Sequence, residues 1–203
     1  YCLMLLVHKR CRLLQLTDAA GGAILHSGNE KGNVSETNDN EIVTLKLDQM
    51  PEYAKTLMFV ITAQEGGNFL NVDKVRAQAR YKDSEANSQF LQILILNVVK
   101  LTGFDRLCAH VKRHQMVIKR VATNTNGNTF DDCKDTLREE ADLFNDAIVI
   151  EERVLRKDKI FMMKKGDGAR LPTGTNSIII GLGWTCEFDF DMDASVVALD
   201  KDK

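Results

Sequence analysis

The sequence predicts a mainly β fold that also contains one long amphipathic helix. Short segments rich in β-branched residues recur along the chain, and clusters of Asn, Gly, Ser and Thr separate them. In these segments the apolar residues either alternate with polar ones or run without interruption, as in half-buried and fully buried strands. Residues 131–157 differ, because their apolar residues recur at helical spacing.

The predicted strands are justified in chain order. Residues 42–47 alternate between polar and apolar types, and residues 56–63 form a near-continuous apolar run. Three more short strands and a longer last one are expected at 72–81, 116–122, 177–180 and 187–199. The Gly181-Leu-Gly183 sequence predicts a close-packed turn before the last strand.

The predicted helix presents Leu137, Ala141, Phe144 and Ile148 on one side, among charged residues. An amphipathic helix of this kind packs on a core or bridges two elements, and binding of a partner protein is the alternative.

Composition excludes several classes of protein. The 203 residues include 27 Lys and Arg against 29 Asp and Glu, a formal net charge of −2, so the basic excess of a nucleic-acid binder is missing. The five cysteines form no C-x-x-C pair, which argues against a zinc site or disulfide framework and indicates a cytoplasmic protein. The apolar run 91–101 is far shorter than the roughly 20 residues that span a membrane.

The strongest chemical signal lies in the last predicted strand. Its alternation places Asp189, Asp191 and Asp193 on one face, roughly 7 Å from one to the next. Such a density of carboxylates suits Ca²⁺, and a solvated acidic face is the alternative. An EF-hand is excluded, because Ala194 replaces the required glycine and the preceding segment has a strand pattern.

A second group of oxygen donors lies in the polar loop 29–41, which contains Asn29, Asp39 and Glu41. This loop could complete a calcium site if it lay beside residues 189–193. The sequence contains no G-x-S-x-G elbow, no P-loop and no defensible nucleophile–histidine pair, so we do not expect an enzyme.

Three segments in order, 163–174, 178–184 and 190–195, resemble the opening of a TerD-family domain, the tellurium-resistance and stress-protein family. The family pattern there is approximately L-x-K-G, GLGWD and FDLDAS; here Thr185 replaces the Asp of the second motif and Met192 the Leu of the third. Residues 22–28 resemble the DGAIxHSGD segment of the family, and the predicted strands 41–47 and 56–63 resemble the two strands after it.

The two halves of the resemblance occur in rotated order. Residues 13–140 match the second half of the family domain, residues 161–203 match the first half, and residues 131–157 form a helical linker. Either one domain is circularly permuted, or the chain runs from the middle of one tandem domain into the next. The first residue, Tyr1, is not Met, which indicates a fragment, a processed product or an internal segment.

The resemblance implies a two-sheet β-sandwich that binds Ca²⁺ and has no established enzymatic chemistry. Asp191 and Asp193 match the family's acidic strand, Asn29 stands where the family has Asp, and Asp39 and Glu41 align with acids of its loop. We therefore expect a calcium-binding module with protein partners but no nucleic acid. The alternative is a metal-free structural subunit of a larger assembly.

Overall fold

The computed structural model confirms that the fold is mainly β. It describes residues 3–7, 10–14, 18–27, 40–52, 54, 56–63, 74–83, 91–92, 106–112, 115–120, 135–136, 139, 167–172, 174–185 and 192–199. Most of these residues belong to strands, which hydrogen-bond into two sheets. Of the predicted helix 131–157, only residues 135, 136 and 139 are described, in helical conformation, and the rest lies outside the described residues.

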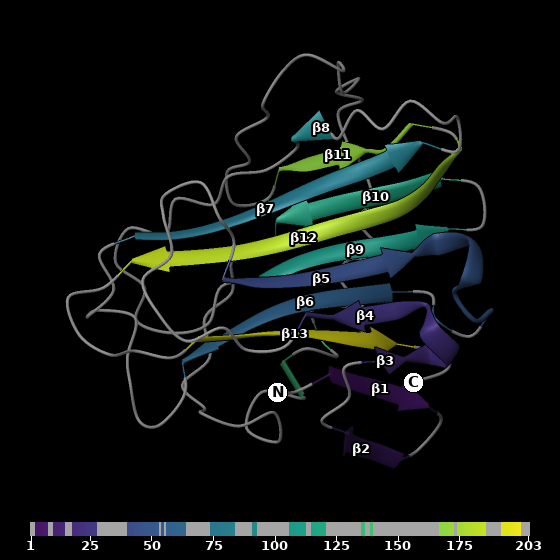
Figure 1. Cartoon of the computed structure of the whole chain (residues 1–203). Helices are drawn as coiled ribbons and strands as arrows, with labels where there is room; N and C mark the ends of the chain where they lie inside the picture. Colours follow the sequence, from purple (N-terminus) through teal and green to yellow (C-terminus); the bar gives the residue numbers. More distant parts are fainter. Residues whose placement is uncertain are drawn as a thin grey trace.

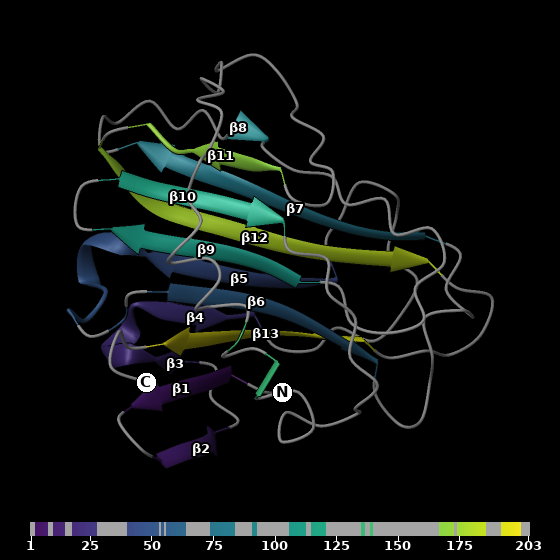
Figure 2. The same ribbon diagram turned by 180° about the vertical axis from the view of Figure 1, so that it is seen from behind.

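The first sheet has seven strands, which face the viewer in Figure 2. Their order is β11 (Gly168–Arg170), β10 (Gln115–Arg120), β9 (Arg106–Lys112), β6 (Thr56–Ala63), β13 (Met192–Leu199), β1 (Leu3–Val7) and β2 (Arg10–Leu14). Neighbouring strands are antiparallel except β1 and β13, which are parallel, with Met4 opposite Val197. Segments from the two ends of the chain are therefore neighbours in one sheet, while the choice between a permuted domain and tandem domains stays a prediction.

The second sheet has six strands and faces the viewer in Figure 1. Their order is β3 (Asp18–Ala19), β4 (Ile24–His26), β5 (Glu41–Lys46), β12 (Thr175–Thr185), β7 (Lys74–Asp83) and β8 (Leu91–Gln92). Short 3₁₀ turns occupy Ala20–Gly22, between β3 and β4, and Leu47–Gln49, after β5. Gly21 has a φ of 66° in the first turn, a left-handed conformation that favours glycine.

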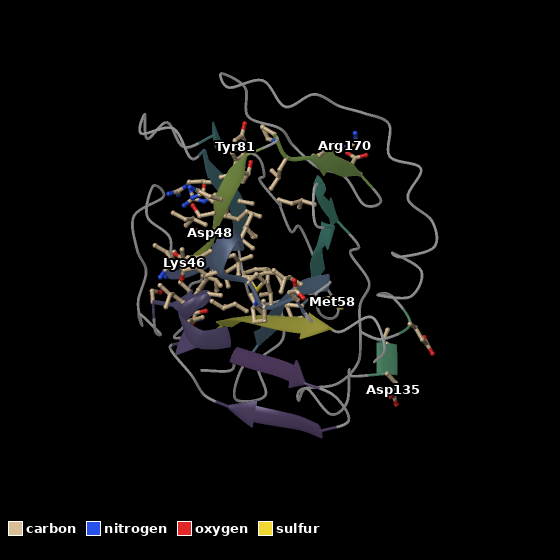
Figure 3. All side chains as sticks on the ribbon, turned by 90° about the vertical axis from the view of Figure 1, so that its right-hand side faces the viewer. Lys46, Asp48, Met58, Tyr81, Asp135 and Arg170 are labelled. Carbon is tan, nitrogen blue, oxygen red and sulfur yellow. The ribbon has the colours of Figure 1, made fainter. Side chains whose placement is uncertain are left out.

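The core includes alternate residues of β5 and β12. Val43 and Leu45 of β5 are buried, as are Ile178, Ile180 and Leu182 of β12. Figure 3 shows many of the described side chains near Met58 of β6, whereas Asp135 and Arg170 lie apart from them. All of residues 57–61 in β6 are buried, as expected of a strand with a continuous apolar sequence.

Most sequence-predicted strands occur within two residues of their predicted ends. Residues 56–63 were predicted as a strand and form β6, and the segment predicted at 72–81 forms β7. The turn predicted at 181–183 is wrong, because β12 continues through both glycines. Gly181 pairs with Ile42 on one side and Gln78 on the other, so hydrogen bonds from two neighbouring strands hold it extended. Of the strand predicted at 187–199, residues 187–191 lie outside the described residues.

None of the helical segments that the structure describes is long and apolar enough to cross a membrane.

Candidate functional site

Three buried polar residues gather where β4 ends and β5 begins. They are His26, Asn40 and Glu41, and Ser27 lies beside them. Ser27 and Asn40 are the described residues on either side of segment 28–39, so these four residues form its base. We call them the loop-base cluster.

Strand periodicity explains why a glutamate enters the interior. Glu41, Val43 and Leu45 alternate with half-buried residues along β5, and all three are buried. In the antiparallel pairing of β4 with β5, His26 lies opposite Val43. Glu41 is two residues from Val43, so it is the diagonal neighbour of His26 on the same face.

His26 and Glu41 contact each other across the two strands. The distance from His26 Nε2 to Glu41 Oε2 is 3.5 Å, and the two side chains are 3% and 0% exposed. The contact is an ion pair when the imidazole is protonated. Loss of either partner would leave a polar group in an interior where water cannot replace the contact.

Asn40 ties the start of β5 to the end of β12. Its backbone N–H donates to the carbonyl of Leu182 at 2.7 Å, which extends the ladder one residue beyond Glu41. Its side-chain Oδ1 accepts a buried hydrogen bond of 3.2 Å from the N–H of Trp184. Asn40 thus binds Leu182 through its backbone and Trp184 through its side chain, and these are two successive inward-facing residues of β12.

Ser27 fixes the other side of the base. Its N–H donates to the carbonyl of Ile42 at 2.9 Å, and its hydroxyl oxygen accepts from the N–H of Ile42 at 3.0 Å. The last residue before segment 28–39 is therefore held to β5 by two hydrogen bonds. The residues on both sides of segment 28–39, Ser27 and Asn40, are therefore each held by hydrogen bonds.

A hydrogen bond joins described residues that border the two predicted groups of calcium ligands. Asn40 is the residue that follows segment 28–39, and it binds Trp184, two residues before segment 186–191. β13 begins at Met192, after that segment, at the same end of the molecule, the left side of Figure 1. The described residues that border the polar segment and the acidic segment therefore lie at one end of the fold.

The predicted ligands are described to different extents. Asn29, Asp39, Asp189 and Asp191 lie outside the described residues. Asp193 is the second residue of β13, opposite Thr62 of β6. Glu41 faces the interior beside His26, and its side chain is 0% exposed. No group of three or more His, Cys, Asp or Glu side chains in the described part of the chain could hold a metal ion.

Of the four residues of the loop-base cluster, only Glu41 was predicted as a metal ligand; His26, Ser27 and Asn40 were not. A sequence signal was present for His26, because it alternates with Ile24 and so shares its buried side. The register between β4 and β5, which places His26 beside Glu41, comes only from the three-dimensional pairing.

Comparison of the chain with protein-family models, with characterised proteins and with solved structures finds no match.

Proposed function

We propose that the chain is a non-enzymatic, TerD-like module that folds as a two-sheet β-sandwich and binds Ca²⁺. The observation that carries this proposal is the hydrogen bond from Trp184 N–H to Asn40 Oδ1. It joins the base of the polar segment 28–39 to the strand that leads into the acidic segment 186–191. The helix predicted at 131–157 acts in this proposal as a packing or bridging element.

The proposed ligands are oxygen donors from both segments and from the start of β13. They are Asn29, Asp39, Asp189, Asp191 and Asp193. Oxygen donors, most of them carboxylates, are the set that Ca²⁺ prefers. In this proposal Glu41 contacts His26 at the base of the segment and does not bind the ion. The proposed ligand set is therefore one residue smaller than the set predicted from the sequence.

Titration with CaCl₂, followed by calorimetry and by thermal denaturation, tests this proposal. Binding to the folded state alone stabilises it by about 2.7 kcal/mol when the ligand is at 100 times its Kd. Asp191→Asn with Asp193→Asn should abolish the response. Asp48→Asn, which changes an exposed acid in the turn after β5, is the matched control and should keep it. No response of the unaltered protein at millimolar Ca²⁺ would overturn the proposal.

The second candidate is a metal-free structural subunit of a larger assembly. The contact of Glu41 with His26 favours it, because one of the predicted ligands serves the interior of the fold instead. Co-purification with protein partners that persists in a chelator, together with indifference to Ca²⁺, would decide for this function.

A further inference from the structure

Strand β6 is buried on both faces of the seven-stranded sheet. Successive residues of a strand point to opposite faces, and all of residues 57–61 are buried, with Met58 at 0% and Val60 at 4% exposure. The six-stranded sheet covers only one of these two faces. Another part of the chain therefore covers the second face at β6.

The register identifies the face that points away from the six-stranded sheet. Leu57 lies in one row of the register with Ile118 of β10, and both residues are buried. Met58 lies in one row with Lys119. Sheets that pack on each other carry polar residues on their outward faces. Leu57 and Ile118 therefore face the six-stranded sheet, while Met58 and Val60 lie on the opposite face, which we call the outer face.

An apolar row crosses five strands of the outer face. Paired positions of neighbouring strands share a face, and the row continues from β9 through β6, β13 and β1 to β2. Its members are Cys108, Met58, Val197, Met4 and Leu13. With strands roughly 4.8 Å apart, the row extends over roughly 19 Å. Met58 is the member whose burial the structure describes, and at 0% exposure it is fully covered.

The helical residues near Asp135 lie on the outer side of this sheet. Figure 3 shows Asp135 beyond β9 and β10, on the side away from β7 and β12. Figure 2, in which the seven-stranded sheet faces the viewer, shows the same short helical piece in green, level with β13 and β1. The chain after Asp135 therefore begins beside the outer face.

The sequence around Asp135 has the pattern of a helix that packs on such a face. Asp135 and Glu139 are both exposed, and residues four apart share one side of a helix, so they mark the side that faces water. At 3.6 residues per turn, the opposite side carries only apolar residues, which are Leu137, Ala141, Phe144 and Ile148. From the first to the last of these a helix rises roughly 16 Å, close to the length of the apolar row.

We propose that the helix predicted at 131–157 lies across the outer face of the seven-stranded sheet and covers the apolar row with its apolar side. The occupant of this surface is thus a segment of the same chain. This arrangement decides between the two roles left open for the helix, because an apolar side that packs on the sheet does not bind a partner protein. The inference rests on the packing role given to the helix in the proposed function and does not depend on calcium.

Photocross-linking tests this arrangement, with p-benzoylphenylalanine in place of Phe144 and the protein in EDTA. Benzophenone inserts into C–H bonds that it touches, so the cross-linked tryptic peptides should include those of β6, β13 or β1. A mixture of isotope-labelled and unlabelled protein separates links within one chain from links between two copies. The matched control has the same residue in place of Glu139, on the exposed side of the helix, and should give few such products.

A second measurement introduces a charge on the apolar side. Phe144→Asp should lower the midpoint of urea denaturation by about 1 M, because the outer face loses apolar contact. Glu139→Gln is the control and should leave the midpoint unchanged.

Three results would overturn the proposal. They are cross-links from position 144 that join two copies, the absence of links to the strands of the seven-stranded sheet, and an unchanged midpoint for Phe144→Asp. All of these measurements are made in EDTA, so a failure of calcium binding leaves them unaffected, and the two proposals fail separately.

Discussion

The contact between His26 and Glu41 predicts a strong coupling between two substitutions. Both side chains are almost fully enclosed, and the atoms that meet are 3.5 Å apart. His26→Leu leaves a buried carboxylate without this partner, and Glu41→Leu leaves a buried imidazole without it. Removal of one partner of a buried polar or charged pair costs about 3 kcal/mol.

The double variant should be much less destabilised than the sum of the two single ones. When both partners become apolar, no polar group remains buried at this point, and the new side chains extend the apolar face formed by Val43 and Leu182. Replacement of a buried pair by packed apolar residues is often nearly neutral. We therefore expect a loss of less than about 2 kcal/mol for the pair, against about 6 kcal/mol for additive effects.

Urea denaturation followed by circular dichroism measures this cycle. With a slope of about 2 kcal/mol per molar urea, each single substitution lowers the midpoint by about 1.5 M. Thr44→Val, on the half-buried side of the same strand, is the control and should change stability by less than about 0.5 kcal/mol. Additive losses in the double variant would refute the reasoning, because they would mean that the two side chains act independently.

Substitutions at two further positions test the hydrogen bond at the start of β5 and the turn before β4. Asn40→Ala removes the acceptor of the Trp184 N–H, so we expect the free energy of unfolding to fall by about 2 kcal/mol and the Trp184 amide to exchange hydrogen faster. An unchanged exchange rate would contradict a role of this hydrogen bond in holding Trp184. Gly21→Ala should cost about 1 kcal/mol in thermal denaturation, because φ is 66° while nothing lies within 4 Å of an added Cβ. Gly21→Asn should recover most of that loss, since Asn tolerates this conformation, and equal losses for both would argue against backbone strain.

The strands could be predicted from sequence because their signals are local. Continuous apolar residues predicted β6, and alternation predicted β5 and β7. The turn predicted from Gly181 and Gly183 was wrong, because a pair of glycines can also lie inside a strand. Here the neighbouring strands β5 and β7 pair with that strand on both sides. Local sequence does not show whether such neighbours exist.

The site was less predictable than the strands. Its polar segment and its acidic strand were identified by composition, and Glu41 was predicted as one of the oxygen donors of the polar loop. The alternation of buried and half-buried residues in β5 begins at Glu41. Only the pairing of β5 with β4 shows that the Glu41 carboxylate lies next to a histidine. The role of Asn40 depends on contact with a residue 144 positions away, which no local pattern encodes.

The parallel pairing of β1 with β13 has a mechanical consequence. Leu3 begins β1 and Leu199 ends β13, so in parallel strands these two residues lie toward opposite ends of the pair. A force that pulls Leu3 and Leu199 apart acts along the strands and loads their hydrogen bonds in shear, all at once, rather than opening them one after another. The same pair that joins distant parts of the sequence in one sheet thus resists extension of the chain in the manner of a clamp.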